Sequence, residues 1–193
     1  MIYQSYIKRL LDIVVSLLTL ILLTPLFIVV AISIKLSSKG DIFFKQTRIG
    51  LNGKPFKIYK FRTMDVNPNR ELNQTTSADP EVFPLGKVLR RLKIDELPQV
   101  FNVLKGDMSI IGPRPCLQQT YDEMPAWARE RFNVRPGLSG LAQVNGNITL
   151  SWEDRWKYDT TYIKKPSLKK DLAIIGKTFL VVLFGEHKFR RAK

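Results

Sequence analysis

The chain has 193 residues, of which 45% are hydrophobic and 25% charged, so it can bury a core of its own and differs from a disordered chain. Its formal net charge of +14 predicts an anionic partner, which can be a nucleic acid, an anionic membrane surface or a phosphorylated small molecule. The single cysteine, Cys116, excludes an internal disulfide, and the single histidine, His187, argues against a Ser-His-Asp triad or a histidine-rich metal site.

An uncharged segment of 22 residues lies near the N-terminus, from Ile13 to Ile34. As a helix it would be about 33 Å long, which is enough to cross the hydrocarbon core of a bilayer, so we expect contact with a membrane. Thr24 and Pro25 stand at its middle. Because a proline breaks the helical hydrogen-bond ladder, this pair predicts a kink.

Positive charges flank this segment on both sides, at Lys8 and Arg9 before it and at Lys35, Lys39, Lys45 and Arg48 after it. Both flanks therefore carry the charge that marks a cytoplasmic side, whereas a simple crossing is normally asymmetric. Two topologies fit. Hydropathy alone favours a kinked single span, and the alternative is a re-entrant helix with both ends in the cytoplasm.

A β-hairpin is predicted after this segment. Two apolar, β-rich stretches, 42–47 and 56–63, flank a turn at 51–54 whose Asn-Gly pair is a strong hairpin signal. In the second strand, the period of two places Lys60 and Arg62 on one face, where two cations can meet an anion. The alternative is an edge strand that exposed charges protect from further pairing.

Two adjacent carboxylates, Asp95 and Glu96, stand among basic residues, and we place the chemistry of the chain there. A helix over 86–94 leads into this dyad, and Pro98 suits the first turn of a second helix that ends at Gly106. The N-terminal amides of that second helix would favour a phosphate or a carboxylate. The alternative is an acidic turn that only complements the helix dipole.

Arg114 lies between Pro113 and Pro115, which hold its backbone extended. A guanidinium that is presented rigidly suits bidentate recognition of phosphate. The alternative is a structural ion pair with a carboxylate such as Asp107.

The rest of the chain divides into a long loop and three helices. The sequence predicts the loop over 65–84 and the helices over 121–132, 152–163 and 167–184. The last helix is almost wholly apolar from Thr178 to Phe184, so it either lies on the bilayer or packs on the domain. Gly137, Gly140 and Gly146 allow close approach of the backbone to a ligand or only tight turns. The basic tail, 187–193, suits anionic lipid headgroups.

Several motifs occur together and in order. They are Phe56-Lys-Ile-Tyr-Lys-Phe-Arg-Thr-Met64, Lys93-Ile-Asp-Glu-Leu-Pro-Gln99, Asn102-Val-Leu-Lys-Gly-Asp-Met-Ser109, Gly112-Pro-Arg-Pro115, Arg135-Pro-Gly137 and Ala142-Gln-Val-Asn-Gly146, with Asp159, Tyr162, Ser167 and Asp171 further on. With these motifs the chain resembles the bacterial sugar transferase family and, more narrowly, its small monotopic phosphoglycosyl transferases. The resemblance runs from about Ile7 to Thr178.

The resemblance implies transfer of a sugar phosphate from a nucleoside diphosphate sugar, usually a UDP-sugar, to undecaprenyl phosphate, the first membrane step of glycan assembly. It implies Asp95 as nucleophile and ligand of Mg²⁺, with Glu96 as its acid-base or positioning partner. The candidates for substrate and phosphate binding are Lys60, Arg62, Arg90, Arg114, Arg135 and Asn147. Asn147 departs from the family pattern, because members that use UDP-sugars often carry an arginine directly after the Val-Asn-Gly segment.

The resemblance also bears on topology and fold. The family is re-entrant at a Ser/Thr-Pro break, which matches Thr24 and Pro25 and reverses the preference for a single span. We therefore expect a re-entrant membrane helix over 1–36 and a catalytic domain over 37–193 on the cytoplasmic face of the bacterial inner membrane, with both termini in the cytoplasm. The expected fold is α+β, mostly α-helical, with one β-hairpin and interfacial amphipathic helices around the active site.

Two other functions compete with this interpretation. A membrane-anchored nucleic-acid-binding module would explain the charge, but the basic residues flank apolar and acidic elements and form no continuous stripe, so we expect membrane lipids and no nucleic acid as partners. The second competing function is a non-catalytic membrane scaffold whose carboxylates only cap a helix.

Overall fold

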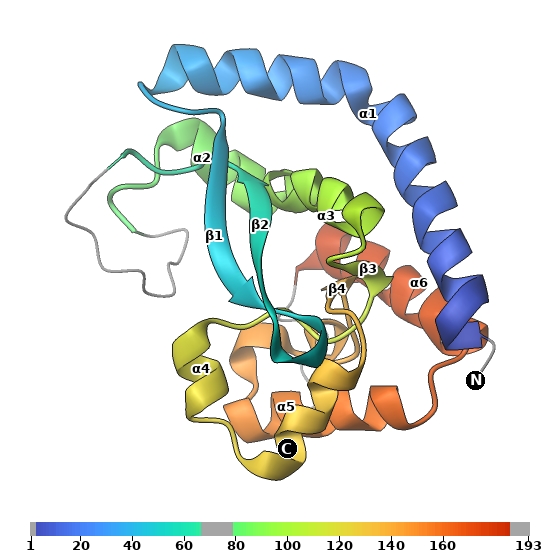
Figure 1. The fold of residues 1–193 in the computed structure, drawn as a ribbon. Coiled ribbons are helices and arrows are strands. Elements are labelled where there is room, and N and C mark those ends of the chain that lie inside the picture. The colour runs from blue at the N-terminus through green and yellow to red at the C-terminus, as the bar shows by residue number, and fades with distance from the viewer. Residues whose placement is uncertain (1–2, 67–78, 186–193) are drawn as a thin grey trace.

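A computed structural model of the chain describes residues 3–66 and 79–185. The basic tail and most of the predicted 65–84 loop lie outside these described residues. A short π-helix, η1 (Tyr3–Ile7), leads into the long apolar helix α1 (Lys8–Ser37). Pro25 lies inside α1, the hydroxyl of Thr24 donates to the Leu20 carbonyl at 2.6 Å, and the helix bends sharply along its length (Figure 1). The predicted kink is confirmed.

α1 is long and apolar enough to cross a membrane, and only 11% of its most apolar part is buried within the protein. A core helix of a soluble protein would be mostly covered, whereas α1 exposes apolar side chains on both sides of the bend. The exposed set includes Leu17, Leu18, Ile21, Leu22, Ile28, Val29 and Ile32. The exposure of this helix indicates a membrane protein.

The β-hairpin is present as predicted. β1 (Phe43–Ile49) pairs antiparallel with β2 (Pro55–Phe61), and Lys60 lies opposite Phe44. The connection is a 3₁₀ turn, η2 (Leu51–Gly53), in which Asn52 and Gly53 both have positive φ, so the Asn-Gly pair supplies the conformation that the tight turn requires.

The dyad segment differs from the expected helix boundary. α2 (Pro84–Arg91) is followed by a 3₁₀ helix, η3 (Ile94–Gln99), and α3 (Val100–Lys105) starts only after it. Asp95 and Glu96 are therefore within η3, not ahead of a helix that Pro98 begins. The reason is Lys93, whose left-handed backbone (φ 57°) ends one helical stretch and starts the next.

A second, parallel pair of strands was not predicted. β3 (Ser109–Ile111) pairs with β4 (Gly137–Ser139). A Cβ on Gly137 would lie 2.0 Å from the backbone nitrogen of Gly112, and one on Gly140 would lie 2.2 Å from the Gly112 carbonyl oxygen. Gly137 and Gly140 therefore allow close approach to a neighbouring segment of the chain, which was not among the alternatives considered for them.

The remaining helices are α4 (Gln118–Asp122), η4 (Ala126–Asn133), η5 (Gln143–Asn145), η6 (Asn147–Thr149), α5 (Trp152–Lys164) and α6 (Leu168–Phe184). The prediction of one helix over 121–132 was wrong, because Pro125 has an extended backbone and separates α4 from η4. α5 and α6 are confirmed, and the side chains of Ser151 and Ser167 accept hydrogen bonds as their N-caps.

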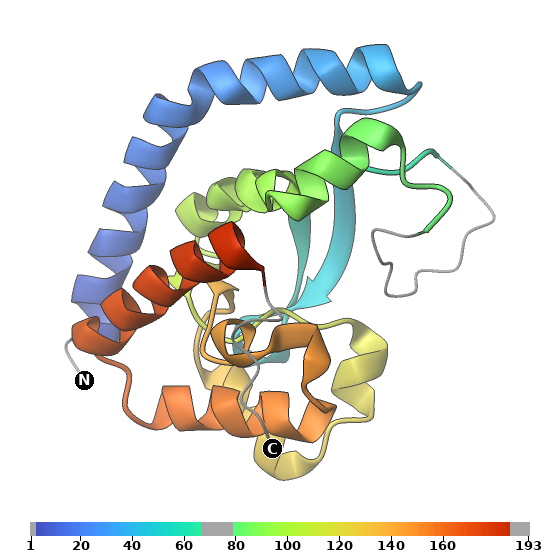
Figure 2. The same cartoon turned by 180° about the vertical axis from the view of Figure 1, so that it is seen from behind.

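Both ends of α1 are attached to the same globular part. On the C-terminal side of the bend, Val30 and Ile34 pack with Phe61 and Leu89 of the hairpin and α2. At the other end, Lys8 forms an ion pair with Asp171 near the start of α6. Figure 2 shows, from behind, how α5 and α6 lie beside this end of α1. The result is a mostly helical fold that holds the hairpin and the dyad on one side of α1.

Candidate active site

The dyad lies on η3, which packs against β2 of the hairpin. Lys93, two residues before Asp95, adopts the left-handed conformation that lysine rarely takes. Such a residue costs about 1 to 3 kcal/mol and is found preferentially at functional sites. The short, strained entry into η3 directs Asp95 and Glu96 toward the hairpin side.

Glu96 is matched by two cations. Lys60 Nζ on β2 lies 2.7 Å from Glu96 Oε1, and Arg114 donates from Nη2 to Oε1 at 2.6 Å and from Nη1 to Oε2 at 3.3 Å. Burial raises the pKa of Glu96, but the positive charges of Arg114 and Lys60 together outweigh it and hold the pKa well below its usual range. Glu96 therefore stays ionised at neutral pH.

Asp95 is held differently. Its side chain is buried, with 8% of the residue exposed, and no group in the described part of the chain donates a hydrogen bond to its carboxylate. Burial and then the charge of Glu96 raise the pKa of Asp95 to about 6, against the opposing charges of Lys60, Lys93 and Arg90. Two neighbouring carboxylates whose pKa values are pushed apart suit different roles, and Asp95 is the one with oxygens available to a reactant or a metal.

Further cations surround the dyad. Arg90 at the end of α2 donates from Nε to Thr63 Oγ1 at 2.9 Å. Arg48 on β1, which we did not predict as a site residue, lies close enough to Arg114 for burial and that neighbouring charge to lower its pKa to about 10. The alternation of strand β1 could have placed Arg48 on the same face as Gln46, to which it donates at 2.6 Å. The positive field at the dyad suits a phosphorylated substrate.

Arg114 forms an ion pair, but its partner is not the carboxylate of Asp107 that the sequence suggested. It pairs with Glu96, while Asp107 pairs with Lys105 at 3.5 Å. Asn102, fully buried, donates to Asp107 at 3.2 Å and accepts from the backbone amide of Tyr59 at 3.0 Å, so this motif residue ties α3 to β2. Sequence reasoning had given Asn102 no role.

Three predicted binding residues lie elsewhere. Arg62 is buried and donates to the carbonyls of Asp41 and Ser38, where it links the strand to the end of α1. Arg135 donates from Nε to the Gly106 carbonyl at 2.9 Å, and Asn147 begins η6 with a positive φ of 44°. Among the described residues, no hydrogen bond joins Arg62 or Arg135 to the dyad, and the binding roles of all three stay predictions.

A metal ion would need ligands beyond those that the described part of the chain offers. Among the residues that the structure describes, no cluster of three or more His, Cys, Asp or Glu side chains could hold one. Mg²⁺ is commonly bound by one or two carboxylates together with substrate phosphates and water. The Asp95 carboxylate, free of hydrogen-bond donors in the described chain, fits that mode.

The family model described as bacterial sugar transferase matches residues 3–185, nearly the whole chain. The chain belongs to the bacterial sugar transferase family. This confirms the resemblance that the motifs around Asp95, Asn102 and Arg114 had indicated, and it identifies a transferase.

Three members of the family illustrate the likeness. A UDP-glucose:undecaprenyl-phosphate glucose-1-phosphate transferase from Klebsiella pneumoniae is 44% identical over 187 residues, covering 92% of this chain and 40% of that protein. The exopolysaccharide production protein ExoY from Sinorhizobium fredii is 40% identical over 198 residues, covering 94% and 88%. A UDP-N-acetylgalactosamine-undecaprenyl-phosphate N-acetylgalactosaminephosphotransferase from Aeromonas hydrophila is 42% identical over 188 residues, covering 94% and 44%. The chain thus spans less than half the length of the Klebsiella and Aeromonas proteins, and most of ExoY.

Proposed function

We propose that this protein transfers a sugar 1-phosphate from a UDP-sugar to undecaprenyl phosphate and releases UMP, with Asp95 as the covalent nucleophile. The observation that carries this proposal is the contrast within the dyad. Glu96 is neutralised by Lys60 and Arg114, whereas Asp95 is buried without a hydrogen-bond donor in the described chain and carries a raised pKa. The names of the Klebsiella and Aeromonas relatives support the donor and acceptor classes.

In the first step, an ionised oxygen of Asp95 attacks the phosphorus that carries the sugar. A P–O bond forms to the carboxylate, the P–O bond to the UMP portion breaks, and its electron pair leaves with UMP. Negative charge on the transferred group is spread over its oxygens, and preorganised cations stabilise it. Lys60, Lys93 and Arg114 are the cations closest to this role.

In the second step, an oxygen of undecaprenyl phosphate attacks the same phosphorus. The acyl phosphate bond breaks, its electron pair returns to the Asp95 carboxylate, and undecaprenyl-diphospho-sugar is formed. We assign Arg90, whose Nε is held by Thr63, to the lipid phosphate. Because its low pKa keeps Glu96 ionised, we assign it to positioning Lys60 and Arg114 and not to donating a proton.

Mg²⁺, bound by Asp95 and the diphosphate of the donor, would neutralise phosphate charge and orient the reacting group. The buried setting of Asp95 excludes water, which protects an acyl phosphate from hydrolysis.

We also propose that α1 is re-entrant and that the catalytic domain lies on the cytoplasmic face of the membrane. A spanning helix separates its two ends by the thickness of the bilayer. Here Lys8 at one end contacts Asp171, and Ile34 at the other packs on Phe61 of the same globular part. The bend between them exposes Ile21 and Leu22, which are 70% and 74% exposed and suit the apex that enters the lipid.

The decisive experiment omits the acceptor. The purified protein, in detergent with Mg²⁺ and a panel of UDP-sugars, should release about one UMP per active site and gain the mass of one sugar phosphate. Asp95→Asn should do neither, and Asp122→Asn, on exposed α4, serves as the matched control. UMP release only after undecaprenyl phosphate is added, with no adduct, would indicate direct transfer and overturn the covalent route.

A further inference from the structure

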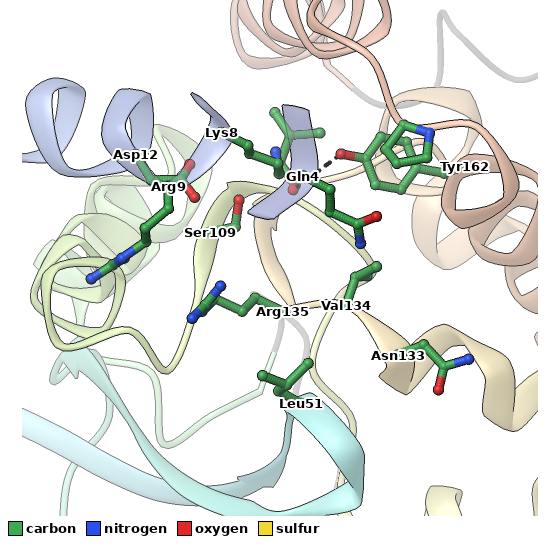
Figure 3. Close-up of a pocket in the computed structure, with 12 residues that line it drawn as sticks. Gln4, Lys8, Arg9, Asp12, Leu51, Ser109, Asn133, Val134, Arg135 and Tyr162 are labelled. Carbon is green, nitrogen blue, oxygen red and sulfur yellow. Dashed lines mark hydrogen bonds between the residues drawn. The ribbon is translucent and has the colours of Figure 1, made fainter. Parts of the chain in front are cut away.

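A polar cavity of about 280 Å³ opens where the first turns of α1 meet the segment around β3 (Figure 3). Its lining includes neither Asp95 nor Glu96. The two arginines that line it donate to carbonyls at the end of α3 and just after it, whereas the dyad lies in η3, before α3 begins. The cavity is therefore separate from the active site.

Two guanidinium groups converge on this cavity. Arg9 donates from Nη2 to the Leu104 carbonyl at 2.8 Å and also to the Val103 carbonyl, and Arg135 donates from Nε to the Gly106 carbonyl at 2.9 Å. Each guanidinium has five N–H groups, so both retain donors after these bonds. Neither arginine forms an ion pair within the described residues.

The other charges leave the cavity with an excess of positive charge. Lys8 also lines it, but its charge is matched by Asp171. Among the described residues that line it, Asp12 is the one with a carboxylate, and its Oδ1 accepts the backbone N–H of Ile110 at 2.9 Å. A single carboxylate therefore stands against Arg9 and Arg135, which favours an anionic ligand.

Ser109 lies between these charged groups, as Figure 3 shows. It is 1% exposed and lines the cavity, and its hydroxyl lies beside the carboxylate of Asp12 as a hydrogen-bond donor. The Ile110 amide and Ser109 thus hold the Asp12 carboxylate, which leaves the two guanidinium groups as the donors to a ligand.

We propose that this cavity binds a phosphate group, with Arg9 and Arg135 as charged donors. Exposed apolar side chains of α1 begin directly after Arg9, at Leu10 and Val14, which are 63% and 44% exposed. With α1 inserted, the cavity lies at headgroup depth, so a phospholipid headgroup can supply the phosphate, and soluble phosphate offers the same chemistry. The site goes beyond the proposed function because the dyad takes no part in it.

The test compares the two sources of phosphate in phosphate-free maltoside detergent. One arm titrates inorganic phosphate against chloride at constant ionic strength and records thermal melting. The other adds phosphatidylglycerol and counts bound lipids by native mass spectrometry. The variants are Arg9→Gln and Arg135→Gln, with Arg129→Gln, outside the cavity, as the control.

We expect phosphate or lipid to bind the wild type and Arg129→Gln, and Arg9→Gln or Arg135→Gln to weaken binding roughly ten- to hundredfold, the change that corresponds to one lost charged hydrogen bond. Binding of lipid alone would identify a headgroup site, and binding of inorganic phosphate alone a soluble-phosphate site. Equal binding by the wild type, Arg9→Gln and Arg135→Gln, or no binding in either arm, would overturn the proposal. Asp95→Asn should bind normally, so failure here leaves the proposed function untouched.

Discussion

Arg131 donates a hydrogen bond from Nη2 to the backbone carbonyl of Arg114 at 2.6 Å. The same nitrogen lies 2.8 Å from Oδ2 of Asp159, and both of these ion-paired side chains are almost fully buried. A buried ion pair therefore holds the backbone from which Arg114 reaches Glu96. The guanidinium can bridge a carboxylate and a carbonyl at once because its donors have a fixed planar geometry.

Arg131→Lys should lower turnover with the fold retained. Lysine keeps the charge opposite Asp159 but lacks the planar fork that also reaches the Arg114 carbonyl, and a shift of about 1 Å at a catalytic group can reduce the rate about a hundredfold. We expect a fall in kcat with little change in KM for the donor, measured by UMP release, and a melting temperature close to that of Arg129→Lys.

The effect of Arg131→Lys on turnover should depend on the presence of Arg114. In an Arg114→Ala background, Arg131→Lys should have little further effect on kcat, because the group that it positions is gone. An equal loss in both backgrounds would show that Arg131 acts on activity by another route.

Glu96→Gln should reduce turnover by about two to three orders of magnitude, the scale of losing one preorganised electrostatic contact, because Lys60 and Arg114 lose their common anchor. It should also move the pH profile. The charge of Glu96 raises the pKa of Asp95, so its removal should shift the acidic limb of kcat/KM below the wild-type value of about 6. An acidic limb that stays in place, measured on the residual activity from pH 4.5 to 8, would contradict the electrostatic coupling within the dyad.

The elements that the sequence predicted well are those set by local patterns. The kink at Pro25, the Asn52-Gly53 hairpin turn and the cap at Ser167 each depend on residues within one or two turns of the chain. The pairing of β3 with β4 depends on Gly112 and Gly137 meeting across a distant loop, which no local pattern reports.

The candidate site shows the same difference between features set by local sequence and contacts between distant segments. Asp95, Glu96 and Arg114 could be named in advance because the motifs place them, but their partners could not. Glu96 takes Lys60 from a strand 36 residues earlier in the sequence, and Arg62, two residues beyond Lys60, instead donates to backbone carbonyls. Alternation along a strand gives the face of a side chain and not the group that it meets.

The topology proposal predicts that both ends of α1 are closed to a periplasmic reagent. Cysteine introduced at Tyr6, which is 75% exposed, or at Lys39, just after the helix, should react with a membrane-impermeant maleimide only after the cells are permeabilised. The background carries Cys116→Ser, because the natural thiol would otherwise react on denaturation. Labelling of either position in intact spheroplasts would contradict the re-entrant topology and support a helix that spans the membrane.

Pro25→Ala tests what sets the bend. If the proline alone does so, position 6 or 39 should become accessible from outside, because alanine restores the straight helix. Unchanged labelling would assign the bend to the contacts at its two ends, such as Lys8 with Asp171.

The last prediction concerns the effect of Asp95 on the stability of the protein. Burial and the charge of Glu96 raise the pKa of Asp95 from 3.8 to about 6, so between these values the native state binds more protons than the unfolded state, and stability falls as pH rises. Above pH 6 the native protein therefore holds an ionised carboxylate at a cost of up to about 3 kcal/mol, since one pKa unit corresponds to about 1.4 kcal/mol.

Asp95→Asn removes this cost, so it should be inactive but more stable at pH 8. The gain should shrink as pH falls through 6 and vanish below 3.8, where the carboxyl group is neutral in both states. Thermal melting from pH 3.5 to 8, with Asp122→Asn as the control, measures this directly. A variant that melts below the wild type at pH 8 would instead make Asp95 a stabilising helix cap, which is the role that the raised pKa argues against.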